Sequence, residues 1–170
     1  LLYNVNNRGG SVFPPERSMQ HPLSGMGFTY LATGWINELS PRAGRLRLHA
    51  PIVGSSQQRI TGQVRYEVSV GEQTETVNIA GAGHLAYEPT AAGIAGATLT
   101  RRLYQEDPRV PDERSQFVLE VMAENDSNQP IVNLSVSGGF QPGRLYVLIY
   151  AAHDPALSGA GLAAIRDMVS

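Results

Sequence analysis

The chain has 170 residues, 42% of them hydrophobic and 16% charged, a composition typical of one globular domain with its own core and not of a disordered tail. The formal net charge is −2, and all 13 basic residues are arginines scattered along the sequence, which excludes a basic footprint for nucleic acid. The absence of cysteine excludes disulfides and cysteine-ligated metals, and no apolar run reaches about 18 residues, so no membrane span is predicted.

Two apolar segments near the N-terminus predict strands. Residues 1–5 predict the first strand, and the Asn- and Gly-rich residues 6–10 predict a tight loop directly after it. Residues 26–33 (MGFTYLAT) predict a second strand that is buried. The proline-containing residues between these two segments lack periodicity and predict irregular structure.

A β-rich block follows, over residues 45–140. Polar and apolar residues alternate in short runs between clusters of Gly, Pro and Asn, which predicts half-exposed antiparallel strands. The runs are residues 45–50, 63–70, 74–80, 97–104, 116–121 and 131–137.

The last segment predicts a buried strand and a helix. Residues 145–152 are almost uninterruptedly apolar, as in a strand covered on both faces, and Ser158 is a candidate cap for a helix that continues to Ser170. Strand followed by helix is the unit of a layered α/β protein. Because the helix pattern continues to the last residue, we expect the chain to be a segment of a longer protein.

Motifs of catalytic or cofactor sites are incomplete. Residues 159–164 match GxGxxA, but residues 153–158 separate the strand from the first glycine, so a Gly-rich helix entry is favoured over a dinucleotide site. No serine lies in GxSxG, and no two histidines have metal-ligand spacing. His153, at the carboxyl end of the predicted strand, is the one histidine worth weighing as catalytic. With Asp154 and Pro155 after it, a turn is the alternative. We therefore predict no metal or cofactor and no catalytic residue in this chain.

Four stretches together resemble a known family. These are LLYNVNNRGG, MGFTYLATGWINE, LRLHAPIV with ITGQVRYE, and GGFQPGRLYVLIYAAHDPALSGAGLAAIRDMVS. They resemble the N-terminal portion of bacterial alpha/beta-hydrolase-domain proteins, a group of serine hydrolases and esterases. The final stretch is the most specific, although His153 stands where the family has Lys.

The resemblance implies an α/β fold, an incomplete α/β-hydrolase-type layered sheet with an inserted β-rich block. Residues 1–44 would form the first core strands with an oxyanion-type loop, residues 45–140 the insertion, and residues 141–170 a core strand and a helix leading to a nucleophile elbow. The nucleophile, acid and histidine would lie beyond residue 170, in a C-terminal portion on the same or a separate chain. The chain alone is then predicted to be inactive towards its small-molecule ester substrate.

Inside the chain, the resemblance places supporting residues. Asn7, Arg8 and Gly9 are candidates for the second half of the oxyanion hole, because a tetrahedral intermediate needs backbone N–H donors from two loops; a structural turn is the alternative. Trp35 is a candidate for the substrate pocket or for packing against the β-rich block. A different class of function stays open: a non-catalytic β-rich binding module, for carbohydrate for example. The compartment is not indicated.

Overall fold

The computed structural model describes residues 2–4, 26, 31–33, 37, 39, 48–54, 59–79, 85–122, 130–157, 163, 166 and 167. The chain divides into two compact units. The sandwich unit comprises Val53–Gly81 and Leu85–Pro155, and the terminal unit comprises Leu1–Ile52, Ala82–His84 and Ala156–Ser170.

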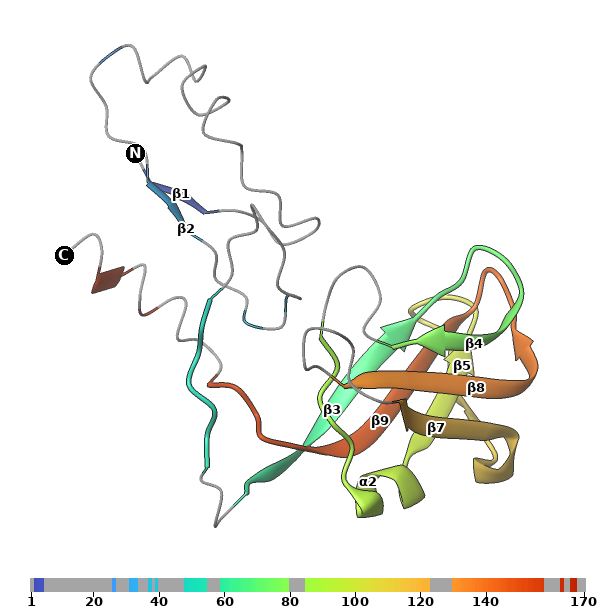
Figure 1. The fold of residues 1–170 in the computed structure, drawn as a ribbon. Helices are drawn as coiled ribbons and strands as arrows, with labels where there is room; N and C mark the ends of the chain where they lie inside the picture. Colours follow the sequence, from blue (N-terminus) through green and yellow to red (C-terminus); the bar gives the residue numbers. More distant parts are fainter. Residues whose placement is uncertain are drawn as a thin grey trace. The chain divides into compact units, whose positions relative to one another are not determined.

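Two antiparallel sheets form the sandwich unit (Figure 1). The four-stranded sheet has the order β3 (Thr61–Val68), β9 (Leu145–His153), β5 (Thr98–Arg102) and β6 (Val110–Asp112). The three-stranded sheet has the order β4 (Thr74–Asn78), β8 (Ile131–Phe140) and β7 (Phe117–Met122). The helix α2 (Ala91–Ala95) precedes β5, and the 3-10 turn η2 (Arg114–Gln116) precedes β7.

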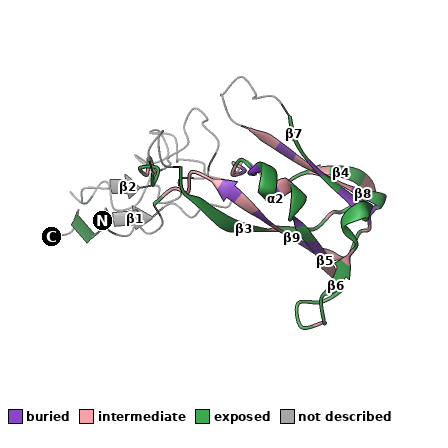
Figure 2. Cartoon of the chain, turned by 90° about the horizontal axis from the view of Figure 1, so that it is seen from below, coloured by how far each residue is buried: buried purple, intermediate pink, exposed green. Residues whose placement is uncertain are grey.

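The predicted alternation of the β-rich block is confirmed by the burial of its strands. In β8, Val132, Leu134 and Val136 are buried, whereas the residues between them are only partly covered. Leu99 on β5 and Leu148 on β9 belong to the same hydrophobic cluster, so the inner faces of both sheets share one core. Figure 2 shows the buried stretches running along β7 and β9.

The predicted fold class is wrong. The described residues form mainly antiparallel sheets and not the layered sheet of an α/β-hydrolase. The apolar run at residues 145–152, predicted as a strand of an α/β core, is β9, and it pairs antiparallel with β3 and with β5. The error lies in the inference from an apolar strand followed by a helix pattern to a layered α/β protein.

The outer face of β9 is covered in another way. Arg102 on β5 and Glu67 on β3 form an ion pair of 3.6 Å between the two strands that flank β9. Long side chains of this kind shield apolar neighbours such as Val147, which is 1% exposed. Helix α2 lies against the same strand so closely that a Cβ added at Gly93 would come within 2.0 Å of the carbonyl oxygen of Ala151. A central antiparallel strand can therefore be apolar on both faces.

The terminal unit contains a parallel strand pair. β1 (Leu2–Asn4) pairs with β2 (Leu31–Thr33), with Tyr3 opposite Ala32, and these strands lie inside the two N-terminal segments predicted as strands. A bridge between Ile52 and Ala156 joins two further parts of this unit. Of the predicted C-terminal helix, the described residues Ala163, Arg166 and Asp167 are helical. None of the helices in the described part of the chain is long and apolar enough to cross a membrane.

Candidate functional site

The four residues predicted for an oxyanion hole and a substrate pocket, Asn7, Arg8, Gly9 and Trp35, lie outside the described residues. Their predicted roles remain predictions. The element that precedes the first three, β1, is described and ends at Asn4.

His153 occupies the last position of β9. Its backbone N–H donates to the carbonyl oxygen of Glu88 at 3.0 Å, and its side chain is half-buried. The ring atom Nδ1 is buried and has no hydrogen-bond partner among the described residues. A catalytic histidine is oriented by a carboxylate on that atom, so this arrangement gives His153 no triad geometry.

The neighbouring carboxylate of Asp154 is bound to an arginine instead. Arg59 Nη2 donates to Asp154 Oδ2 at 2.6 Å, and Arg59 Nε lies 3.2 Å from the same oxygen. Glu88 Oε2 is 3.6 Å from Arg59 Nη2. The hydrogen bond from Arg59 holds the pKa of Asp154 below its usual value, which keeps this carboxylate ionised and paired. The cluster therefore fastens the end of β9 to the chain before β3.

A groove opens on the three-stranded sheet where the pairing of β4 and β8 is irregular. Thr76 pairs with Ser135, but Thr74 pairs with Phe140. A single β4 residue, Glu75, therefore lies opposite the four-residue segment 136–139 of β8. Such a bulge diverts one strand from its partner and leaves space between them.

Two consecutive glycines make this bulge possible. Gly138 has φ +80° and Gly139 has φ +77°, in the left-handed region that other residues adopt at a cost. At Gly139 there is also little room, because an added Cβ would lie 3.1 Å from the carbonyl oxygen of Thr74.

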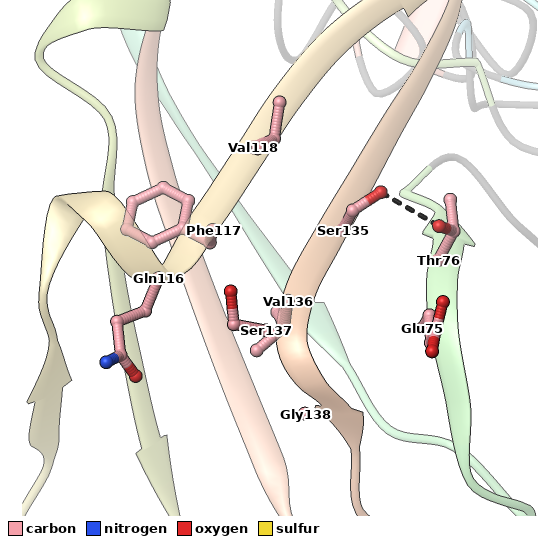
Figure 3. A pocket seen from close by; sticks show the side chains of 9 residues that line it. All are labelled: Glu75, Thr76, Gln116, Phe117, Val118, Ser135, Val136, Ser137 and Gly138. Atoms are coloured by element: carbon pink, nitrogen blue, oxygen red, sulfur yellow. Dashed lines mark hydrogen bonds between the residues drawn. The ribbon is translucent and has the colours of Figure 1, made fainter.

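The groove has a volume of about 330 Å³. Its lining combines hydroxyl, amide and carboxylate groups with the apolar side chains of two valines and a phenylalanine, as Figure 3 shows. The lining residues are Glu75, Thr76, Gln116, Phe117, Val118, Ser135, Val136, Ser137 and Gly138. Most of them are exposed, so the groove is shallow and wet rather than an enclosed apolar cavity.

Hydrogen bonds hold the groove in shape. The hydroxyl oxygens of Thr76 and Ser135 are 2.8 Å apart, and the amide of Gln73 donates to the carbonyl oxygen of Gly138 at 3.3 Å. On the β7 side, Arg114 donates to the carbonyl oxygen of Phe117 at 2.7 Å and lies 4.7 Å from the centre of its ring. The polar wall is thus fixed before any ligand arrives.

Metal binding has no support in the described part of the chain, where no three His, Cys, Asp or Glu side chains are grouped closely enough to hold an ion. In the groove itself, Glu75 is the only carboxylate among the lining residues. One carboxylate with hydroxyl neighbours is a set for hydrogen bonding and not for a hard cation.

The groove was missed in the sequence although a signal was present. Residues 131–137 alternate regularly, and Gly138-Gly139 follow them immediately. Glycine inside a strand pattern marks a bulge or a close backbone approach, but we ended the predicted strand at Ser137. The structure continues β8 through both glycines to Phe140.

Comparison with known proteins identifies no relatives: no family model matches the sequence, and no similar curated protein or solved structure was found.

Proposed function

We propose that this chain is a segment of a serine hydrolase that transfers an acyl group from an ester to water. The observation that carries the proposal is the parallel pairing of β1 with β2. Parallel strands need a crossover connection of about a dozen or more residues, and ligands of parallel sheets bind outside the carboxyl ends of the strands. The segment with Asn7, Arg8 and Gly9 follows the carboxyl end of β1.

In this proposal the segment after β1 supplies half of an oxyanion hole. A serine outside residues 1–170 attacks the ester carbonyl carbon while the catalytic histidine takes the proton of its hydroxyl group, and the carbonyl electron pair moves onto oxygen. Backbone N–H groups near Asn7, Arg8 and Gly9 stabilise that negative oxygen, the alcohol leaves with a proton from the catalytic histidine, and water then releases the acyl group as an acid.

The sandwich unit supplies no reacting group in this scheme. Two observations support a non-catalytic role for it. His153 Nδ1 has no partner within the described residues, and the adjacent Asp154 is held by Arg59. In this proposal the unit is an accessory module attached to the catalytic part.

A fluorophosphonate probe and p-nitrophenyl esters test the proposal. The polypeptide encoded by the complete reading frame should be labelled by the probe and hydrolyse the esters, whereas residues 1–170 alone should do neither. Replacing Gly9 by Pro removes one backbone donor, and we expect kcat to fall by about 10²–10³-fold if that donor is used.

Gly62→Ala is the control, because an added Cβ at Gly62 on β3 has no atom within 4 Å. It should leave kcat unchanged. Labelling of a serine inside residues 1–170, or a full-length protein with no esterase activity and no labelling, would contradict the proposal.

A further inference from the structure

We propose that the bulge groove on the three-stranded sheet binds a neutral, polyhydroxylated ligand, a carbohydrate. This inference does not depend on the proposed hydrolase activity, because it concerns a different surface. It rests on the position of the groove, on the chemistry of its lining and on the bonds that fix it.

The lining groups match the hydrogen-bonding properties of a sugar. Hydroxyl side chains of Thr76, Ser135 and Ser137 can each donate and accept, as sugar hydroxyls do, and the amide of Gln116 offers both functions in one group. The carboxylate of Glu75 accepts two hydrogen bonds at once, which suits two adjacent sugar hydroxyls. Val118, 49% exposed, offers an apolar surface for the C–H side of a ring.

The groove is also preorganised and of suitable size. The paired hydroxyls of Thr76 and Ser135 are held 2.8 Å apart, and side-chain amides of Gln73 and Gln141 both donate to the Gly138 carbonyl oxygen at 3.3 Å. Little ordering is therefore needed when a ligand binds. The volume of about 330 Å³ lies at the lower end of the range for small-molecule sites, about 300–1,000 Å³.

Other ligand classes fit less well. No arginine, lysine or histidine lines the groove, so an anion such as phosphate lacks a cation to bind. An added peptide strand needs a row of free backbone groups, but the floor is β8, the central strand of its sheet, and the Gly138 carbonyl oxygen is already occupied by two amides.

The groove is suited to binding a carbohydrate and not to cleaving it. Hydrolysis of a glycosidic bond ordinarily requires two carboxyl groups flanking the bond, whereas Glu75 is alone among the lining residues. Without an exposed aromatic ring in the lining, stacking adds little. We therefore expect dissociation constants in the millimolar range.

Titration of the 170-residue chain with maltose, cellobiose and N,N′-diacetylchitobiose, followed by amide NMR shifts, tests the inference. At least one disaccharide should shift the amide signals of Thr76, Ser135 and Ser137 in a saturable way. Inorganic phosphate and a valine-rich peptide of extended conformation should not.

Variants test the site without touching the core. Glu75→Gln should weaken binding about tenfold, because hydrogen bonds to a charged group are lost, and Ser137→Phe should abolish binding by filling the groove. Thr98→Val, exposed on the four-stranded sheet, is the matched control and should bind as the wild type does.

The inference is overturned if none of the three disaccharides shifts these signals, or if Ser137→Phe binds like Thr98→Val. Saturable shifts by phosphate or by the peptide at the same residues, with none from the sugars, would also overturn it. Loss of esterase activity in the complete protein would leave these sugar titrations unaffected, so the two proposals fail separately.

Discussion

The hydroxyl of Tyr150 on β9 donates a hydrogen bond of 2.7 Å to the backbone carbonyl oxygen of Tyr87. Tyr66 on β3 stacks on Tyr150 with ring centres 5.9 Å apart, and its own hydroxyl accepts from the backbone N–H of Tyr87 at 3.0 Å. Two buried or half-buried tyrosines thus fasten the segment before α2 to the four-stranded sheet. Burial raises the pKa of Tyr150, so its proton stays in place as the donor.

Replacing Tyr150 by Phe should therefore lower the free energy of unfolding. The Tyr87 carbonyl oxygen loses a buried donor, and such a loss costs about 1–2 kcal/mol. Urea denaturation followed by far-UV circular dichroism measures the effect. The rate of amide hydrogen exchange should also rise in residues 85–90. Tyr104→Phe is the control, since Tyr104 is 69% exposed and should change stability little. Equal stability of the two variants would contradict this role of Tyr150.

The bulge should depend on Gly139. In Gly139→Ala, the left-handed backbone (φ +77°) costs about 1–2 kcal/mol, and the new Cβ crowds the Thr74 carbonyl oxygen at 3.1 Å. The unfolding midpoint in urea should fall, and amide signals around Ser137 should move. Gly62→Ala has free space and no left-handed backbone, so it should be neutral. A neutral Gly139→Ala would mean that the bulge relaxes without cost.

Much of the sandwich could be predicted from period-two alternation. Residues 63–70, 74–80, 97–104, 116–121 and 131–137 were predicted as antiparallel strands, and β3, β4, β5, β7 and β8 overlap these ranges in turn. One face of each such strand is solvated, so polar and apolar residues alternate along its sequence and the strand can be predicted. The class of the whole chain was wrong because the most apolar segment carries no such signal.

For β9, burial on both faces has two possible causes that a single sequence does not separate. One cause is helices that cover a parallel sheet, and the other is long side chains and a short helix that cover a central antiparallel strand. The contacts that decide, Arg102 with Glu67 and α2 with Ala151, join residues far apart in sequence. The groove was missed for a related reason. The pairing of Thr74 with Phe140 depends on the register between two strands, and Gly138-Gly139 is the only local sign of it in the sequence.

Asp112 should make the sandwich unit less stable at neutral than at low pH. Its side chain is 2% exposed, Oδ1 lies 3.3 Å from Arg101 Nη1, and Oδ2 has no hydrogen-bond partner in the described part of the chain. Burial raises the pKa of Asp112 above its usual value, although Arg101 and Arg144 act in the opposite direction. The folded state therefore holds the proton more tightly than the unfolded state, and this contribution to stability is lost as pH rises through the raised pKa.

Asp112→Asn removes that titration. Relative to wild type, the variant should gain stability between about pH 3 and about pH 7, measured by urea denaturation at each pH. Arg101, with a side chain 41% exposed, stays solvated when its partner is neutralised. Glu106→Gln, exposed in the loop before β6, is the control. A difference between Asp112→Asn and wild type that does not change with pH would contradict the assignment.

Asp154 should have the opposite effect of pH on stability to that of Asp112, and its backbone conformation adds a second effect. It has φ 53°, a left-handed conformation that Asn tolerates and Ala does not, and its carboxylate is bound by Arg59. Because that hydrogen bond lowers the pKa of Asp154, its contribution to stability is present above the unfolded pKa and is lost as pH falls through the folded pKa. Asp154→Asn should thus be less stable than wild type at neutral pH and approach the stability of wild type at low pH.

Asp154→Ala should be less stable than Asp154→Asn by a further amount of about 1–2 kcal/mol. This difference should not vary with pH, because the steric cost of a left-handed backbone does not depend on protonation. Urea midpoints of the three proteins at about pH 7 and about pH 3 separate the two effects; an Asn-to-Ala gap that closes at low pH would show that the positive φ is not maintained.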